Sequence, residues 1–190
     1  NFPGGFTPKI HMRCLEVWQY PCKEIKELTK DILRKYKPDV LVEIGAGRQL
    51  LLAKTCFAPI ARENGVEFVA IDVQKPQGSV PDWFKQVNVR YFQMKKRCVF
   101  IVSWFLGNNP QRMQYFVNPF MKCLKRSNVL ALVTIGEPAG MSCVNEKTHQ
   151  SIIKHLCKNM SPKEYPFLLS SQNDFCVPGP LSATCVTVYP

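Results

Sequence analysis

Four short apolar runs recur along the chain, and this rhythm constrains the fold more than any other feature of the sequence. The runs span residues 40–44, 67–72, 98–104 and 129–135. Each has the length of a buried strand. Segments with the pattern of helices lie between and after them, at 22–37, 49–63, 111–124 and 145–159. Strands that alternate with helices predict an α/β fold, a doubly wound and mostly parallel sheet with helices on both faces.

Two further predicted strands, 167–170 and 183–189, close the chain and are joined by an irregular segment instead of a helix. A connection without a crossover helix suits antiparallel neighbours, so we expect the last strand to run against the others. Between the second and third apolar runs, residues 74–86 are predicted as a loop with a short helix around Trp83. Residues 87–92 are predicted as an additional strand.

Residues 22–190 are expected to form one domain, because 190 residues is the usual size of a single domain. Residues 1–21 contain Pro3, Gly4 and Pro8, which predicts an extended arm. The chain opens without Met or a signal-peptide pattern, so we expect it to be a piece of a longer protein. The aromatic residues of the arm could cover a ligand crevice or pack on another region or a partner protein.

The charge balance favours anionic partners. Lys and Arg number 25 against 14 Asp and Glu, which gives a net charge of +11. Such an excess indicates nucleic acid first, with RNA favoured, although basic residues can also form an ordinary solvated exterior. No stretch approaches 18 apolar residues, so we expect no membrane span and no membrane partner.

The nine cysteines are expected to be reduced thiols. Their spacings are scattered, and no C-x-x-C pair occurs. Several lie inside apolar runs, where a free thiol acts as a small hydrophobic group. We therefore expect a cytoplasmic or nuclear protein without a metal site.

A glycine-bearing turn follows the first predicted strand and precedes a helix. Gly45 and Gly47 allow a sharp turn and a close approach of a ligand to the backbone. The following helix offers free N–H groups at its start. Asp72 ends the second strand, where its carboxylate can hold the hydroxyls of a ribose. The alternative is that the glycines merely shape a turn in another α/β fold.

The segment E-I-G-A-G-R, residues 43–48, resembles motif I of the class I S-adenosylmethionine-dependent methyltransferases. In that motif an acidic residue ends the first strand before G-x-G. A dinucleotide fingerprint would instead need glycine at Leu50, which argues against a nicotinamide-dependent oxidoreductase. The family often has a third glycine where this chain has Gln49. The resemblance implies a class I methyltransferase fold and S-adenosylmethionine as cofactor, its methionyl part held by Glu43, Gly45, Ala46 and Gly47, its ribose by Asp72 and its adenine by Val73 and Gln93.

The resemblance also implies that the acceptor lies beyond the predicted strands 98–104 and 129–135, which are the fourth and fifth along the chain. Ser103 and Trp104 occupy the end of the fourth strand, where amino-group methyltransferases often carry a polar, proline and aromatic tetrad. Trp104 could stack on a flat acceptor or simply fill the core. Glu137 follows the fifth strand and could serve as a general base or be a surface acid. The aspartate of the K-D-K-E tetrad of ribose methyltransferases is absent near the fourth strand.

Two functions are compatible with these residues. The first is methyl transfer to a nucleic acid, RNA being favoured by the charge. The second is a catalytically degenerate methyltransferase-like domain that senses the cofactor or binds RNA or proteins. The resemblance together with the basic charge indicates the first.

Overall fold

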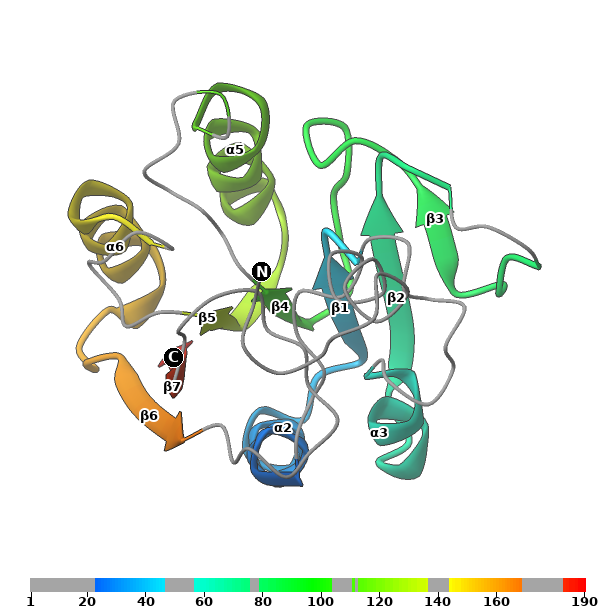
Figure 1. The fold of residues 1–190 in the computed structure, drawn as a ribbon, viewed down its shortest axis with the longest axis horizontal. Helices are drawn as coiled ribbons and strands as arrows, with labels where there is room; N and C mark the ends of the chain where they lie inside the picture. Colours follow the sequence, from blue (N-terminus) through cyan, green and yellow to red (C-terminus); the bar gives the residue numbers. More distant parts are fainter. Residues whose placement is uncertain are drawn as a thin grey trace, which may run out of the picture.

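This computed structural model shows a seven-stranded mixed sheet between two layers of helices (Figure 1). The structure describes residues 23–46, 57–75, 79–103, 111, 113–136, 144–168 and 183–190. The strands are β1 (Val40–Ile44), β2 (Glu67–Asp72), β3 (Phe84–Gln86), β4 (Cys98–Ser103), β5 (Val129–Gly136), β6 (Lys163–Leu168) and β7 (Ala183–Tyr189).

The order of the strands across the sheet is β3-β2-β1-β4-β5-β7-β6. Strands β1 to β5 pair in parallel, and β7 runs antiparallel to both β5 and β6. This arrangement confirms the predicted doubly wound sheet with a reversed last strand. Because the order reverses between β1 and β4, the carboxyl ends of these strands open a crevice for a ligand. The predicted arm, residues 1–21, lies outside the described residues.

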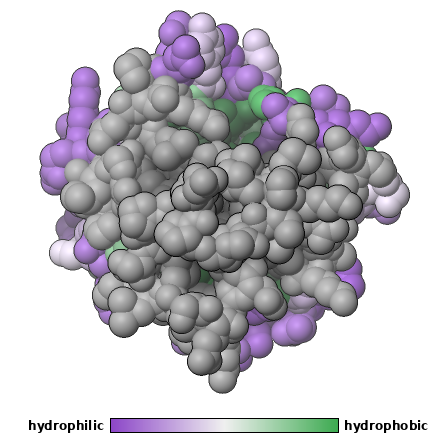
Figure 2. All heavy atoms as spheres, viewed as in Figure 1, coloured by the Kyte–Doolittle hydropathy of each residue, from purple (hydrophilic) through white to green (hydrophobic). Residues whose placement is uncertain are grey.

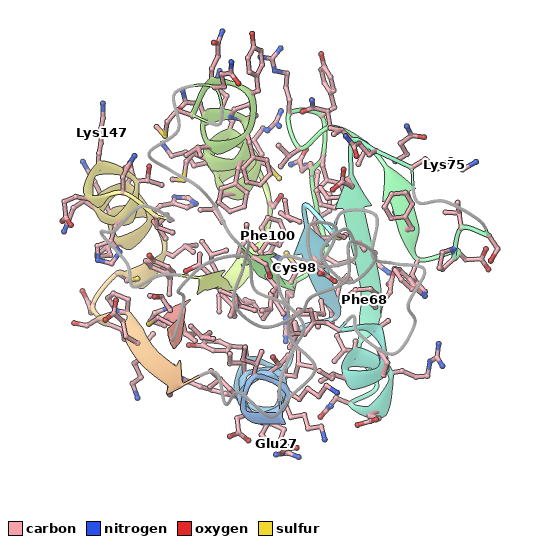
Figure 3. All side chains as sticks on the ribbon, viewed as in Figure 1. Glu27, Phe68, Lys75, Cys98, Phe100 and Lys147 are labelled. Atoms are coloured by element: carbon pink, nitrogen blue, oxygen red, sulfur yellow. The ribbon has the colours of Figure 1, made fainter. Side chains whose placement is uncertain are left out.

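Helices cover both faces of the sheet. On one face lie α2 (Lys23–Tyr36) and α3 (Ala58–Glu63), and on the other lie α5 (Asn118–Arg126) and α6 (Glu146–Ile152) (Figure 1). A π-helical segment precedes α5 (η2, Met113–Val117) and another follows α6 (η3, Ile153–Cys157). Glu27 and Lys147 extend outward from α2 and α6, whereas Phe100 lies over the centre of the sheet (Figure 3). Of the predicted helix 49–63, only residues 57–63 are described, and α3 begins at Ala58.

Alternating side chains of the strands build a separate core under each helical layer. In β1, Leu41 packs into the core under α2 and α3, whereas Val40 and Val42 pack under α5. This alternation follows from the two-residue period of a strand. Each such side chain contributes about 1.5–3 kcal/mol when it is fully buried. The apolar pattern therefore determines which face of each strand meets which helices.

The third strand differs from the prediction. The structure places it at Phe84–Gln86, which pair with β2, and residues 87–92 form turns instead of a strand. Asn88 explains the difference, because its Oδ1 accepts a hydrogen bond from the Arg90 N–H at 2.9 Å and its carbonyl accepts one from the Tyr91 N–H. Such side-chain bonds stabilise turns. The predicted helix around Trp83 is also wrong, since a turn there leads directly into β3.

The last two strands were predicted to exist, but the first of them begins earlier than expected. The prediction 167–170 is replaced by β6 at Lys163–Leu168, which contains Pro166. A proline argues against a strand when only the sequence is read. However, β6 is an edge strand of the sheet, where proline is tolerated.

A buried tyrosine links β7 to α6. Tyr189 is fully buried, and its hydroxyl lies 2.9 Å from His149 Nδ1. The hydroxyl also bonds with the side chain of Thr134 on β5, and burial raises the pKa of Tyr189 above its ordinary value. The hydroxyl therefore stays protonated and connects three elements.

We expect Tyr189→Phe to lower the free energy of unfolding by about 1–2 kcal/mol, because the buried Thr134 and the half-buried His149 both lose a hydrogen-bond partner. Urea-induced unfolding measures this loss. Tyr115→Phe, on a ring that is 66% exposed, is the matched control and should change stability by less than about 0.5 kcal/mol. Equal stabilities of the two variants would contradict the structural role of the Tyr189 hydroxyl.

Candidate cofactor-binding site

The turn after β1 is held against the end of β2. Gly45 has a φ of +72°, a left-handed conformation that favours glycine. The backbone N–H groups of Gly45 and Ala46 both donate to the carbonyl of Ile71, at 2.9 and 3.2 Å. These bonds place the turn beside Asp72, the residue that follows Ile71. Gly47, predicted as the second glycine of the turn, lies outside the described residues.

A phenylalanine from η2 packs beside this turn and leaves Gly45 exposed. A Cβ built on Gly45 would lie 3.8 Å from Phe116 Cζ, an ordinary contact. Backbone conformation rather than space is therefore what requires glycine at this position. Phe116 stacks on Phe120 with ring centroids 6.1 Å apart, and Phe120 contacts Phe100 of β4. This row of rings fixes the apolar wall beside the glycine turn.

The carboxylate of Asp72 is oriented by the backbone that follows it. Its Oδ1 accepts a hydrogen bond from the Gln74 N–H at 2.8 Å, and its carbonyl accepts one from the Val87 N–H at 2.9 Å. Asp72 is half-buried and Val73 is 55% exposed. The carboxylate is thus positioned at the carboxyl end of β2 while it remains accessible to a ligand.

These residues share one cleft with a volume of about 240 Å³. Gly45, Asp72 and Val73 lie on its β1–β2 side, as the sequence predicted. The opposite side includes residues that the sequence analysis missed, Asn88, Val89, Tyr115 and Phe116. Asn88 and Asp72 are polar, and the remainder of the lining is largely apolar. A green hydrophobic strip is visible between the hydrophilic side chains over α5 and those around β3 (Figure 2).

Of these additional cleft residues, the sequence carries a signal for Asn88 but not for Tyr115 and Phe116. Asn88 follows the third strand closely, and correct placement of that strand would have put it at the cleft. Tyr115 and Phe116 belong to the segment after the fourth strand, and both were assigned to a helix without a functional role. Their place at the cleft depends on how η2 packs over the turn after β1, which local patterns do not encode.

Glu43 lies behind the turn, on the side of α2 and α3. It shares the strand face of Leu41, and its carboxylate accepts a hydrogen bond from the backbone N–H of Phe57. Although part of the residue is accessible, its Oε2 is buried, and within the described part of the chain this oxygen has no hydrogen-bond partner. Burial raises the pKa of Glu43 to about 8, and the Phe57 N–H opposes this shift. A buried carboxylate oxygen of this kind suits a nearby positive charge.

Three other predicted residues, Ala46, Gln93 and Ser103, do not line the cleft among the described residues, and the side chain of Ala46 is buried in the core under α2 and α3. The side-chain amide of Gln93 donates to the carbonyl of Arg126, at the end of α5. Ser103 ends β4 and pairs in register with Ile135 of β5. Trp104 and Glu137, the other two candidates for the acceptor site, lie outside the described residues. Their proposed roles stay predictions.

The described cysteines offer no reactive thiol. Cys98, Cys123, Cys157 and Cys185 are free and buried, as expected for small hydrophobic groups. Burial raises the pKa of Cys98 to about 12, so its thiol stays protonated. Among the described residues, no cluster of three or more His, Cys, Asp or Glu side chains could hold a metal ion. No helix in the described ranges is long and apolar enough to span a membrane.

Together, the strand order with its reversed β7 and the cleft beside Gly45 define a class I methyltransferase-like Rossmann fold. Comparison of the sequence finds no matching family model and no matching curated protein.

Solved structures of similar shape include methyltransferases, at identities that bear on the fold alone. The methyltransferase domain of bacterial CtHen1 is 10% identical, with 86% of this chain and 94% of that one covered and a TM-score of 0.46. PH1948 of Pyrococcus horikoshii, a protein assigned as an RNA methyltransferase, is 13% identical, with 96% and 88% covered and a TM-score of 0.47. The 16S rRNA methylase RmtB is 11% identical, with 87% and 61% covered and a TM-score of 0.37.

Proposed function

We propose that the chain binds S-adenosylmethionine in the cleft beside Gly45 and catalyses methyl transfer, with RNA as the favoured acceptor. One observation carries the proposal. The Gly45 turn is bonded to Ile71, so a turn open to a ligand and the accessible carboxylate of Asp72 line the same cleft. This pairing suits a nucleoside, because the carboxylate can accept hydrogen bonds from the ribose hydroxyls beside a closely approaching backbone.

The residues present suit the parts of this cofactor. Asp72 would accept hydrogen bonds from the ribose hydroxyls, and Val73, Val89 and Phe116 would form an apolar wall for the adenine ring. Asn88 offers polar contacts at the edge of that wall. The sequence proposal for Glu43 is also retained, because its buried Oε2 would be stabilised by the positively charged methionyl end. The ring contact proposed for Gln93 is given instead to Asn88, which lines the cleft.

The cofactor supplies a methyl group activated by its sulfonium, so the chain needs to contribute little covalent chemistry. Its residues would position the acceptor in line with the methyl group and exclude water, which can account for much of the acceleration. Ser103 at the end of β4, with Trp104 and Glu137 that follow β4 and β5 in the sequence, remain the proposed residues for orienting the acceptor and receiving its proton.

A second candidate function is a binding module that has lost catalysis. Gln49 stands where the family often has a third glycine, the tetrad after β4 lacks its prolines, and the aspartate of the K-D-K-E tetrad is absent there. This alternative keeps the cofactor cleft and removes the reaction. Both candidate functions include cofactor binding, so they differ only in whether a methyl group is transferred.

Thermal unfolding with S-adenosylmethionine, S-adenosylhomocysteine and NAD, followed by a transfer assay, tests both functions. A cofactor at about 100 times its dissociation constant should stabilise the protein by about 2.7 kcal/mol. We expect the two adenosyl compounds to stabilise it and NAD to have no effect. Transfer of labelled methyl groups to total RNA, compared with a protein extract, then identifies the acceptor. Binding without transfer supports the second candidate, and stabilisation by NAD alone contradicts both.

A further inference from the structure

The positive charge of the chain is concentrated in one segment. Residues 83–136 contain no Asp or Glu at all. The segment carries nine of the Lys and Arg residues, which are Lys85, Arg90, Lys95, Lys96, Arg97, Arg112, Lys122, Lys125 and Arg126. In space Lys96 of this segment is paired with Glu67, so the cations that bear on an anionic partner are those away from such acids, around α5.

Part of this charge forms a stripe on the outer side of η2 and α5. Tyr115, Asn118, Lys122 and Lys125 are spaced three or four residues apart and are all exposed, with Arg126 beside the last of them. Residues at this spacing lie on one side of a helix. The opposite side is buried against the sheet by Val117, Phe120, Cys123 and Leu124.

The connection that follows β3 runs beside this stripe. The Arg126 guanidinium donates to the carbonyl of Arg90 at 2.6 Å, and the Gln93 amide donates to the carbonyl of Arg126. Figure 1 shows this connection passing next to α5 on its way to β4. The bonds hold Tyr91 next to the stripe, with 75% of that residue exposed. We call the surface formed by Tyr91, Arg90 and the exposed side of η2 and α5 the basic track.

The basic track begins at the cofactor cleft. Tyr115 lines that cleft, and Arg126 lies at the other end of α5. The two residues are eleven positions apart in the chain, which corresponds to about 16 Å along a helix. Two of the large hydrophobic residues with the highest exposure, Tyr91 and Tyr115, therefore lie on two bonded segments that also carry exposed cations. Exposed aromatic rings between cations suit the stacking of unpaired bases beside a phosphate backbone.

We propose that the basic track binds a single-stranded polynucleotide and leads its acceptor nucleotide into the cofactor cleft. The inference rests on the proposed function for the position of the acceptor, whereas binding to the track can be measured without it. Lys122, Lys125 and Arg90 contact the phosphates, and the rings of Tyr91 and Tyr115 stack on bases. A duplex lacks free base faces for these rings, so single strands are favoured.

Fluorescence anisotropy of the full chain with a labelled single-stranded RNA tests the track. Single-stranded DNA of the same sequence and the RNA duplex serve as further probes. We expect the double variant Lys122→Glu and Lys125→Glu to weaken RNA binding at least about tenfold at low salt, because two phosphate contacts become repulsive. The slope of log affinity against log salt should fall by about 1 to 2. Tyr91→Ala should weaken binding at least about fivefold through lost stacking.

The matched control reverses the charges of two lysines outside the basic track. Lys147 and Lys154 are exposed on α6 and η3, and their replacement by Glu changes the net charge equally. We expect this control to weaken RNA binding by less than about threefold. Circular dichroism of each variant, and Lys122→Gln with Lys125→Gln as a milder pair, separates loss of binding from loss of folding.

Each outcome decides the inference. Equal binding of single-stranded RNA and DNA supports the proposed track, because both strands offer phosphates and unpaired bases. A preference for RNA also supports it and identifies RNA as the polynucleotide. Equal losses in the two charge-reversed variants, or duplex RNA that binds as tightly as single strands, overturn it. Absence of polynucleotide binding also overturns it and would favour a protein partner. Cofactor binding by the Lys122 and Lys125 variant is measured separately, so a failed cofactor assignment remains distinguishable from a failed track.

Discussion

Replacement of Asp72 by Asn should lower the affinity for S-adenosylmethionine by about tenfold to a hundredfold without unfolding the protein. The reason is that hydrogen bonds to a charged group contribute about 1.5–3 kcal/mol, and the amide loses the charge and one acceptor. The bond from the Gln74 N–H to Oδ1 can persist in the variant, so the local backbone should stay in place. Isothermal titration calorimetry measures the affinity, and thermal unfolding without ligand checks the fold.

The matched control for this prediction is Asp82→Asn. Asp82 is exposed, lies in the turn before β3 and is outside the described lining of the cleft. The same loss of one negative charge should there leave the affinity within about twofold, since distant surface charges are screened by salt. If both variants bound the cofactor as tightly as the unmodified chain, Asp72 would not hold the ribose.

Replacement of Glu43 by Gln should remove a pH dependence of stability that the unmodified chain shows. The pKa of Glu43 is raised to about 8, so between its ordinary value near 4.5 and about 8 the folded chain holds this proton more tightly than the unfolded chain. The free energy of unfolding should therefore fall as the pH rises through this range. At about 1.4 kcal/mol per pKa unit, the loss amounts to several kcal/mol by pH 9. The glutamine does not titrate, so its variant should be the more stable protein at that pH.

Urea-induced unfolding at a series of pH values from 5 to about 9 measures this difference, with Glu63→Gln as the control. The side chain of Glu63 is 61% exposed, so its replacement should leave the pH profile unchanged. Saturation with S-adenosylmethionine should flatten the profile of the unmodified chain, because a nearby positive charge lowers the pKa of Glu43. A profile for Glu43→Gln that matches the unmodified chain would show that another group causes the dependence.

The two predictions examine opposite sides of the same turn. Asp72 lies in the cleft, where a ligand reaches it directly, and Glu43 lies behind the turn, on the strand face that packs under α2 and α3. A loss of affinity in the Asp72 variant together with a flattened profile for Glu43 on cofactor binding would place the nucleoside and methionyl parts at their proposed ends. Either result alone would support only one half of the assignment.

Local patterns in the sequence were sufficient for the fold class and for the start of the site. The apolar runs at 40–44 and 67–72 became β1 and β2, and the glycine after the first of them became the left-handed turn. These features depend on neighbours in the chain: strand length, the two-residue alternation and the freedom of glycine at a positive φ. Gly45, Asp72 and Val73 were therefore predictable as parts of one cleft, because parallel strands bring their carboxyl ends to one edge.

The tertiary structure decided what lies on the other side of that cleft. Val87 to Phe92 alternate like a strand, yet the hydrogen bonds of Asn88 turn them back and leave Asn88 and Val89 at the cleft. Gln93 has a side chain that could recognise adenine, but packing of α5 places it on the Arg126 carbonyl. The packing of Phe116 beside the turn likewise depends on a contact between residues 71 positions apart in the chain. The sequence by itself determined which strands form and where the chain turns, because these follow from local periodicity and backbone freedom. Only the tertiary structure decided which side chains complete the site, because long-range packing positions them.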